Sequence, residues 1–435
     1  MKKKRVSVFL STLLVASALL GACSSNTSSP DTGSQGGKEN LGSQGNQEQV
    51  VLSMHSWRVE DGDGYKKIIK EFEQTNPGVK IEFKAFKSTE YNTILNTALQ
   101  GDSGPDIMQL RPYQAGMSLA DSGYLEPLDS VPGINHFAPD VLKAATAKDG
   151  KVYGVPLSLN STQIYYNKKM FVDQGIQEPK TWDELLQTAK ALKDKGVTPF
   201  AFGAKEAWLL SLSHGVIAPA EYGGNEFVDK VQKGEANFLS PEFKKSIEQM
   251  KELAPYFPDN FVGLDQNDTR ALFATEKAAM YIHGSFDLDP MHKLNPNLDV
   301  DFFTLQGQDG NPLITTWVDG SWGVNAKSPH KEAALKFMEF MATQKFGEMF
   351  ANEFKRISAV PGVKVDDPLV NKMAERTEKN ATPYLILVYF GEGNPTTKAE
   401  LENSLQGMYL DKMTPDQVAE TVQKSAESWF APFKK

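Results

Sequence analysis

The residues of this chain best suited to chemistry are its six tryptophans, some of which stand beside carboxylates and small polar residues. Trp317 and Trp322 bracket the segment Asp319-Gly320-Ser321. Flat aromatic faces beside paired hydrogen-bonding groups can hold a neutral ring-shaped molecule with apolar C–H faces and polar edges. This combination indicates binding of such a molecule.

Two further tryptophans have positions that favour binding. Trp57 follows the first expected strand, at the place where loops gather around the ligand sites of α/β folds. Trp208 follows the apolar run 200–202 in a segment that we expect to be a loop. Any of these tryptophans could instead fill the core or cover the surface. Trp182 lies inside a predicted helix start, so we expect it to pack.

Carboxylates and cationic side chains supply the polar half of the expected site. Asp287 and Asp319 could each accept two hydroxyl protons, although either could instead cap a helix or lie in a surface turn. Arg58, Gln109 and Arg111 follow strand ends and could donate to hydroxyls. Exposed charged side chains are also common at such places, so a purely solvated role is the alternative for them.

Enzyme motifs are missing or incomplete. The Gly101–Gly104 segment is similar to a serine-protease nucleophile loop, but it falls at a predicted helix end and nothing specifies a His and an Asp partner. No phosphate loop, dinucleotide glycine pattern or His-Glu-x-x-His helix occurs, and the six histidines lack metal-ligand spacing. The Asp61–Gly64 segment begins like a calcium loop, but Phe72 stands at its twelfth position.

We therefore expect no enzyme activity, no catalytic residue, no cofactor and no metal. An exported, anchored glycoside hydrolase that uses two of the 55 acidic residues is the alternative.

Alternating strand and helix patterns must position these residues. Short apolar or alternating runs predict strands, and apolar residues at i, i+3, i+4 and i+7 predict helices between them. A capping box opens one helix at Thr181, and Ser-Pro pairs open two more. The expected elements are strands or extended segments at 50–54, 79–83, 107–108, 152–156 and 163–166, and helices at 64–76, 91–98, 181–196, from 240 and from 328. This order predicts an α/β fold with largely parallel pairing.

Length and charge limit the class of protein. A single core stops growing near about 250–300 residues, so 435 residues predict two lobes or domains. Four of the 46 basic residues and no acid lie within residues 1–22, so the rest of the chain has a net charge of −13. Such a chain lacks the basic surface that nucleic acid requires. We therefore expect no nucleic-acid partner.

The first 49 residues indicate export. Basic residues 2–5 precede a 15-residue apolar stretch, Val6–Leu20, which suits a secretory leader better than a membrane span. Leu20-Gly21-Ala22-Cys23 is similar to a bacterial lipobox, in which cleavage precedes Cys23 and its thiol carries lipid. An ordinary signal peptide followed by an incidental cysteine is the alternative. Residues 24–49 are almost wholly polar and predict a flexible linker.

Six segments in order resemble one family, the extracellular solute-binding proteins of bacterial sugar ABC importers, the group that includes maltose-binding protein. They span nearly all of residues 51–433. The segments are Gly104-Pro105-Asp106, Gly150–Pro156, Tyr165–Lys168, Pro179–Leu185, Phe273–Phe286 and Ser328–Ala334.

The resemblance implies a type II periplasmic-binding-protein fold, with a ligand cleft between two lobes joined by hinge crossings near residues 159–162, 318–323 and after 361. Lobe 1 would comprise residues 50–160 and 323–362, and lobe 2 residues 161–322 and 363–435. Residues 1–22 would be the leader, and 23–49 the linker with lipidated Cys23. Ser285 and Phe286 enter the expected site through the family segment 284–287, whose third residue is often tryptophan.

The resemblance also implies partners and a location. The protein would be a monomer, anchored through Cys23 to the outer face of a Gram-positive-like cell membrane, and it would deliver its ligand to ABC permease subunits. The expected ligand is a short α-linked oligosaccharide of the raffinose or isomaltose type. Xylo-oligosaccharides are the rival sugars, glycerol phosphate would need a basic clamp, and a polyamine would need several convergent carboxylates.

Overall fold

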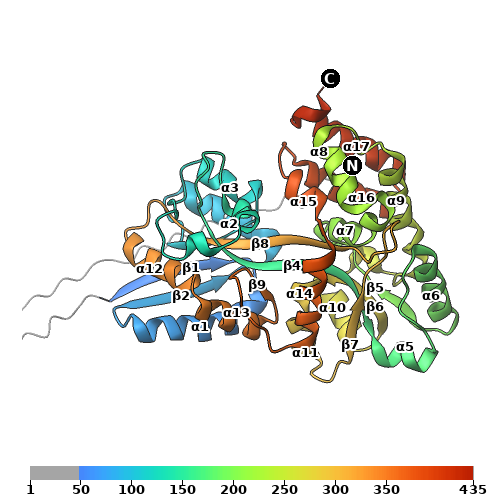
Figure 1. Ribbon diagram of the computed structural model, residues 1–435, viewed down its shortest axis with the longest axis horizontal. Helices are drawn as coiled ribbons and strands as arrows, with labels where there is room; N and C mark the ends of the chain where they lie inside the picture. The colour runs from blue at the N-terminus through green and yellow to red at the C-terminus, as the bar shows by residue number, and fades with distance from the viewer. Residues whose placement is uncertain (1–48, 435) are drawn as a thin grey trace, which may run out of the picture. The chain divides into compact units, whose positions relative to one another are not determined.

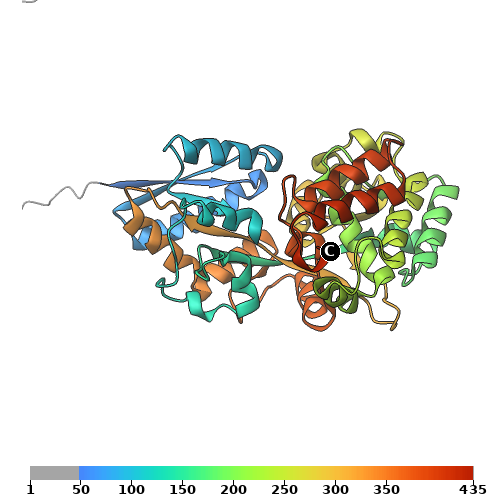
Figure 2. The same cartoon turned by 90° about the horizontal axis from the view of Figure 1, so that it is seen from above.

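The computed structural model describes residues 49–434. The predicted leader, Cys23 and the predicted linker up to residue 48 lie outside the described residues. Figures 1 and 2 show two lobes side by side, joined by long strands that run through the middle of the molecule. Within residues 49–434, no helix is both long enough and apolar enough to cross a bilayer.

Lobe 1 begins with alternating strands and helices, as the sequence predicted. Its first elements are β1 (Val50–Ser56), α1 (Gly62–Thr75), β2 (Val79–Ala85), α2 (Ser88–Gln100), β3 (Ile107–Leu110) and α3 (Gln114–Asp121). The i, i+3, i+4, i+7 face of α1 is buried, which confirms that helix. The later helices α12 (Lys331–Met341) and α13 (Gln344–Phe354) pack against the same core as α1.

Lobe 2 is larger and richer in helices. Its elements are α5 (Lys168–Gln174), α6 (Trp182–Asp194), β5 (Thr198–Ala201), α7 (Trp208–Tyr222), α8 (Gly224–Lys233), α9 (Pro241–Glu252), α10 (Gln266–Ala274), β6 (Ala278–Gly284), α11 (Leu288–Leu294), β7 (Val300–Phe303), α14 (Pro368–Asn380), β10 (Ala381–Pro383), α15 (Leu385–Tyr389), α16 (Thr397–Tyr409) and α17 (Pro415–Glu427). Apolar side chains from α7, α9, α16 and α17 form one core, and those from α10, α11 and α14 form another.

Two long strands link the lobes. β4 (Val155–Asn167) and β8 (Ile314–Val324) pair antiparallel from Val155↔Trp322 to Thr162↔Thr315. β8 pairs with β3 at its lobe 1 end, and β4 pairs with β6 and β7 at its lobe 2 end. A third, short strand, β9 (Ile357–Ser358), pairs with the middle of β4. The two extended segments expected within residues 152–166 are therefore parts of one strand.

The sheet formed by the described strands runs β2-β1-β3-β8-β4-β6-β5. β1 pairs in parallel with β2 and β3, and β5 pairs in parallel with β6. All pairings of β4 are antiparallel. The prediction of largely parallel pairing is thus wrong at the centre, because β8 runs antiparallel to both β3 and β4, although its lobe 2 end pairs in parallel with β10.

Three helix starts test the sequence reading. The capping box at Thr181 is confirmed, since its hydroxyl accepts from Glu184 and the Glu184 side chain accepts in return. Pro241 opens α9 as predicted. Ser328 does not cap a helix: its hydroxyl donates to Asp106 at 2.6 Å, and α12 begins three residues later.

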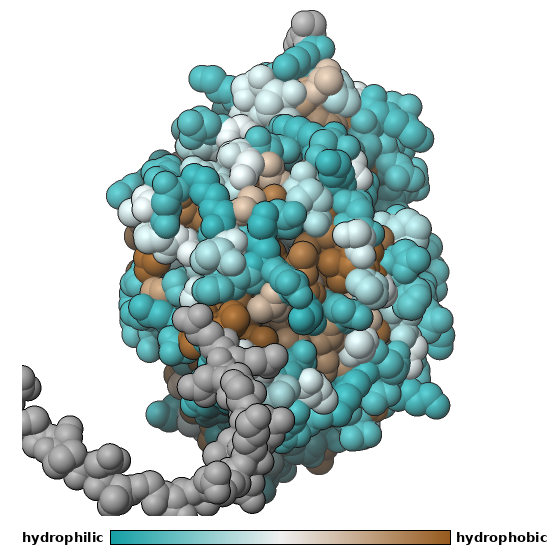
Figure 3. Space-filling view, turned by 90° about the vertical axis from the view of Figure 1, so that its left-hand side faces the viewer, coloured by the Kyte–Doolittle hydropathy of each residue, from teal (hydrophilic) through white to brown (hydrophobic). Residues whose placement is uncertain are grey.

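The outward face of lobe 1, opposite lobe 2, is largely hydrophilic, with apolar side chains gathered near its middle (Figure 3). Val51, on β1, is one exposed apolar residue of this lobe. A mostly polar outer face matches the ordinary charged fraction of the chain, 23%. Several of the side chains proposed from sequence for binding, among them Arg58, Trp317 and Asp319, lie instead at or beside the strands that join the lobes.

Candidate functional site

One face of the β4–β8 pair carries a row of polar and aromatic residues. Opposed residues in an antiparallel pair point to the same side, and every second residue shares that side. Ser158 lies opposite Asp319, and Asn160 lies opposite Trp317. We call Ser158, Asn160, Trp317 and Asp319 the hinge face. All four are at least nine-tenths buried.

Arg58 joins lobe 1 to this face. It follows β1, and its guanidinium donates to the carboxylate of Asp319 and lies 4.9 Å from the ring centroid of Phe286 in lobe 2. Burial alone would lower the pKa of Arg58, but the carboxylates of Asp319, Asp61 and Glu60 outweigh burial and raise it. Arg58 therefore carries a fixed positive charge between the two lobes.

Trp57 and Arg111 form a stacked pair on lobe 1. The Arg111 guanidinium lies 4.2 Å from the Trp57 ring centroid, and its Nη2 donates to the Ser88 carbonyl at 2.8 Å. Burial, together with the positive charge of Arg58, lowers the pKa of Arg111 to about 10. One face of the Trp57 indole is thus covered by a cation that α2 holds in place.

Lobe 2 contributes a series of aromatic rings. Trp208 lies 6.5 Å from Phe286, Phe286 lies 6.4 Å from Trp317, and Trp317 lies 5.4 Å from Tyr384, all between ring centroids. Trp208 is the first residue of α7, so the expectation that it lies in a loop is wrong. Its helical position still places it beside Phe286, next to the contact with Arg58.

Several polar atoms in this region are buried without a partner. They include both amide atoms of Asn160, the indole Nε1 of Trp208, Nε of Arg58 and Nε2 of Gln109. An unpaired buried polar atom costs free energy, so such atoms are scarce in folded proteins. Their concentration around the hinge face is the arrangement expected of a site that hydrogen-bonds a polar ligand.

An acidic residue of lobe 2 lies near the same region. Tyr384 donates from its hydroxyl to Ser211 at 2.8 Å, and Ser211 donates to Glu402 on α16 at 2.8 Å. Lys398 also donates to the Glu402 carboxylate. The charge of Glu402 acts on Arg111 of lobe 1 and opposes the lowering of its pKa.

Sequence reasoning missed Asn160, Tyr384 and Glu402. Asn160 had a signal in the sequence, because Ser158, Asn160 and Thr162 alternate on one face of a segment that begins and ends with apolar residues, Val155–Leu157 and Ile164–Tyr166. Tyr384 and Glu402 had none, since they come from segments more than 200 residues away from Asn160 in the chain.

Asp287 is not placed to bind a ligand. Its carboxylate is fully buried and accepts from Arg270 Nε at 2.9 Å and from the Tyr281 hydroxyl at 2.9 Å. Burial alone would raise the pKa of Asp287, but Arg270 and the hydrogen bonds outweigh it and the pKa is lowered. Its acceptor capacity is already used, so the prediction that it binds hydroxyls is corrected to a structural role.

Trp322 is also corrected. It is fully buried in the core of lobe 1, and its indole N–H donates to the Tyr65 hydroxyl at 2.9 Å. Trp317 and Trp322 are five residues apart on one strand, so they point to opposite faces of the sheet. Only Trp317 belongs to the hinge face.

The remaining predicted residues lie at the margin of the region. Gln109 is fully buried on β3, and its side-chain oxygen accepts from the Ser56 hydroxyl at 2.6 Å. The Ser285 hydroxyl accepts from the backbone N–H of Ser161 at 3.1 Å, which fixes the turn before Phe286 against β4. Both residues support neighbours that reach the hinge face. Among the described residues, no cluster of three or more His, Cys, Asp or Glu could hold a metal ion.

Residues 56–347 match the model of a family described as bacterial extracellular solute-binding protein. A multiple sugar-binding protein of Streptococcus mutans is 29% identical over 332 residues, which are 74% of this chain and 78% of that protein.

Two solved structures share the fold. A chitin oligosaccharide binding protein is 25% identical, with a TM-score of 0.75 over 88% of this chain and 99% of its own. The solute-binding protein RafE in complex with raffinose is 21% identical, with a TM-score of 0.74 over 89% of this chain and 100% of its own. These similarities confirm the two-lobe periplasmic-binding-protein fold.

Proposed function

This chain belongs to the bacterial extracellular solute-binding protein family, and from that premise we propose that it captures an oligosaccharide at the hinge face and delivers it to an ABC permease. The family consists of solute-binding proteins of transporters rather than enzymes, so the glycoside hydrolase alternative is set aside. The Streptococcus mutans relative, a multiple sugar-binding protein, supports a sugar as the solute.

The observation that carries the proposal is the meeting of aromatic rings and unpaired polar atoms from both lobes at the hinge face. The rings of Trp57, Trp208 and Trp317 supply flat apolar surfaces for the C–H faces of a sugar. Asn160 can both donate to and accept from hydroxyls, and Asp319 can accept from them. A neutral sugar needs both kinds of group at once.

The charges of the region favour a neutral sugar over the alternatives. Arg58 is engaged by Asp319, and Arg111 is held by Ser88 over Trp57, so the two cations do not form an open phosphate clamp. A polyamine would meet both of these cations. We therefore place glycerol phosphate and polyamines behind oligosaccharides, with the raffinose and isomaltose types first and xylo-oligosaccharides as rivals.

The proposal includes the organisation of the chain. Lobe 1 would comprise residues 50–160 and 323–362 and lobe 2 residues 161–322 and 363–435, with Cys23 carrying lipid after removal of residues 1–22. A monomer anchored in this way to the outer face of the membrane would hold its ligand near the permease. Metabolic lipid labelling of the wild-type chain and of Cys23→Ser tests the anchor: incorporation into the wild type alone supports it.

Calorimetry against a solute panel tests the binding function. The panel contains raffinose, isomaltotriose, xylotriose, chitotriose, glycerol 3-phosphate and spermidine. We expect saturable binding of a neutral oligosaccharide near micromolar affinity, which corresponds to about −8 kcal/mol, with the sugar recovered intact. No heat and no change in tryptophan fluorescence with any neutral sugar would contradict the proposal, and released monosaccharide would restore the hydrolase reading.

A further inference from the structure

The strand β8 has no neighbouring strand along one edge of its middle part. On the side away from β4, β10 pairs with residues 314–316 of β8 and β3 pairs with residues 321–324. Among the strands that the structure describes, none pairs with residues 317–320 on that side. Two residues of the hinge face, Trp317 and Asp319, lie in this interval. The backbone groups there that point away from β4 need partners other than a strand.

Tyr113 of lobe 1 supplies one such partner. It lies between β3 and α3, and its hydroxyl oxygen accepts from the backbone N–H of Val318 at 3.1 Å. Its ring packs against the lobe 2 core to which Trp317 and Tyr384 belong. Tyr113 therefore connects lobe 1 with the middle of β8 and with lobe 2.

The backbone of Tyr113 adopts a conformation that is unusual for its residue type. Its φ is 58° and its ψ is −149°, a region that residues other than glycine rarely occupy. Its N–H donates to the carbonyl of Ala144 at 2.7 Å, and its own carbonyl accepts from the N–H of Gly116 at 3.1 Å. Strained residues of this kind persist where their surroundings fix them, and they cluster at ligand sites. This is the pattern expected where a side chain has to stand at one place for binding.

The hydroxyl proton of Tyr113 is available to a ligand. A phenol hydroxyl can accept and donate, and Val318 uses only its accepting side. Among residues 49–434, no group accepts the proton. Burial raises the pKa of Tyr113 to about 12, and the charge of Asp319 adds to the shift, so the phenol keeps its proton at neutral pH. The ring is also partly exposed, so a ligand can reach it.

We propose that Tyr113 is a further binding residue for the sugar and donates its phenol proton to a sugar oxygen beside Asp319. This inference rests on the proposed sugar-binding function and deepens it. Asp319 accepts a hydroxyl proton and Tyr113 donates one, so the two side chains offer opposite hydrogen-bonding roles to neighbouring sugar hydroxyls. A site that bonds a ligand oxygen discriminates against analogues that lack it, because its own polar group is then left unpaired. Tyr113 would therefore select among sugars.

Calorimetry of the purified protein with raffinose, isomaltotriose, xylotriose and chitotriose tests the proposal. Tyr113→Phe keeps the ring and removes only the hydroxyl, so it should bind the sugar that the wild type binds about tenfold more weakly. Unchanged affinity in a folded Tyr113→Phe protein would overturn the role of Tyr113 and leave the proposed function standing. No binding of any of these sugars by the wild type would contradict both.

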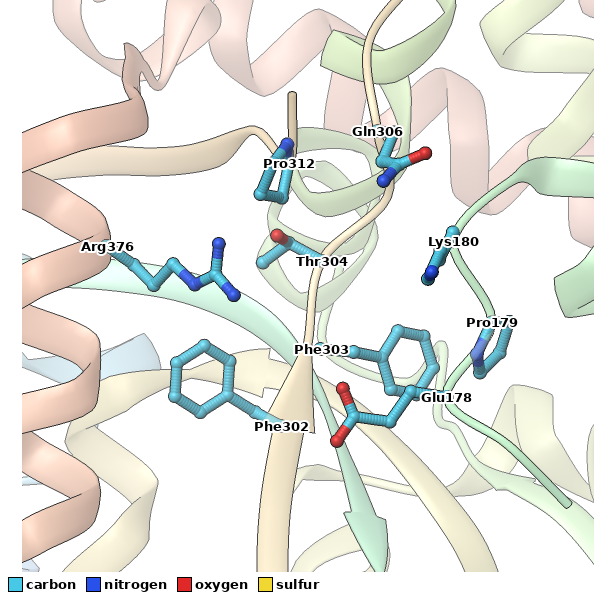
Figure 4. A pocket seen from close by; sticks show the side chains of 9 residues that line it. All are labelled: Glu178, Pro179, Lys180, Phe302, Phe303, Thr304, Gln306, Pro312 and Arg376. Carbon is cyan, nitrogen blue, oxygen red and sulfur yellow. The ribbon is translucent and has the colours of Figure 1, made fainter. Parts of the chain in front are cut away.

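Tyr166→Phe is the matched control. The Tyr166 hydroxyl donates to Glu178 at 2.7 Å. Glu178 lines a pocket of about 120 Å³ in lobe 2 that shares no residue with the hinge face (Figure 4). This substitution therefore also removes a hydrogen-bonded phenol hydroxyl, but apart from the proposed site, and it should leave the sugar affinity unchanged. An equal loss of affinity in the two phenylalanine variants would overturn the proposal.

Monodeoxy derivatives of the bound sugar separate a direct contact from a structural role. Each derivative is titrated into the wild type and into Tyr113→Phe. The derivative that lacks the oxygen bonded by Tyr113 should bind both proteins equally, whereas the others keep the difference. The same difference for every derivative would assign a structural role through Val318 and overturn the proposal. If circular dichroism shows that Tyr113→Phe does not fold, Tyr113→Gly, which suits the backbone at this position, takes its place in the same titrations.

Discussion

Two buried arginine–aspartate pairs of this molecule consist of the same residue types but differ in their hydrogen bonds. Arg270 and Asp287 form a closed network within lobe 2, in which Tyr281 also donates to the carboxylate. Arg58 and Asp319 join lobe 1 to the hinge face, and Nε of Arg58 has no partner. The first pair has used its hydrogen-bonding capacity, whereas the second retains some of it.

The number of donors around the carboxylate distinguishes a structural charge pair from one that could take part in the proposed binding. A buried carboxylate with several donors holds the fold together and has nothing left for a ligand. Among the described residues Asp319 accepts only from Arg58, so its carboxylate keeps acceptor positions that a ligand's hydroxyls could use. The tryptophans follow the same rule, because the N–H of Trp322 is bonded to Tyr65 while the N–H of Trp208 is buried and unbonded.

The largest effect on stability is expected from a substitution that breaks the Arg270–Asp287 pair. Asp287→Asn should lower the free energy of unfolding by about 3–5 kcal/mol, because it leaves the Arg270 charge buried without its partner. Urea unfolding measures this loss. Asp63→Asn, which removes a pair on the exposed face of α1, is the control and should leave the midpoint unchanged. A stable Asp287→Asn protein that no longer binds sugar would reverse the assignment of the two pairs.

The next effect concerns the tryptophans of lobe 2. Trp208→Ala should weaken sugar binding by about 2 kcal/mol, roughly thirtyfold, because it removes an aromatic surface and an unbonded donor from the site. Trp182→Ala is the matched control, since the Trp182 N–H already donates to Glu252 at 2.9 Å. Calorimetry of both variants gives the comparison. Equal losses in two folded variants would contradict the placement of the site.

A smaller loss of sugar affinity should follow from a substitution in the Arg58–Asp319 pair. Asp319→Asn keeps the shape of the side chain but removes its charge, so we expect about a tenfold loss of sugar affinity, or about 1.4 kcal/mol. Its loss of stability should be below that of Asp287→Asn, because Glu60 still lies 3.4 Å from Arg58. Titration and unfolding of the two asparagine variants side by side sharpen the contrast. A larger loss of stability in Asp319→Asn than in Asp287→Asn would contradict the distinction between the two pairs.

The smallest effect is a pH dependence that comes from His283, whose Nδ1 lies 3.9 Å from the Asp287 carboxylate without a hydrogen bond to it. Burial lowers the pKa of His283 to about 4. The nearby charge of Arg270 lowers this pKa further, whereas that of Asp287 opposes the shift. The unfolded chain binds this proton near pH 6.5 and the folded chain does not, so stability falls as the pH falls from about 6.5 to about 4. Between pH 7 and pH 6, His283 should contribute less than about 1 kcal/mol to this loss of folding stability.

Unfolding of His283→Gln at both pH values checks that contribution. The variant should lose less stability than the wild type over the same interval. An identical pH dependence in the two proteins would show that His283 does not stay neutral in the folded chain.

Much of the fold could be predicted from local patterns. The apolar face of α1, the alternation along β2 and the capping box at Thr181 each lie within a few residues, and the structure confirms all three. Antiparallel pairing at the centre could not be predicted in this way, because it depends on β4 and β8, which are some 150 residues apart in sequence. The residue pattern of a strand does not specify which other strand it will pair with.

The site was predicted less well, for a related reason. Residue type identified Trp57, Arg58, Trp208 and Asp319, which the structure brings to one region. Residue type cannot tell a satisfied group from an unsatisfied one, so Asp287 was chosen on the same grounds as Asp319. That distinction depends on donors such as Tyr281, whose position only the folded chain reveals.

The continuous pair of β4 and β8 has a mechanical consequence. Any rotation of one lobe against the other must twist or bend a hydrogen-bonded pair of strands, so this link resists motion more than a single extended chain would. In such a rotation the residues nearest to the axis are displaced least. Asn160 and Trp317 lie opposite each other on these strands, so a solute held by them would stay nearly still while the rest of each lobe swings around it.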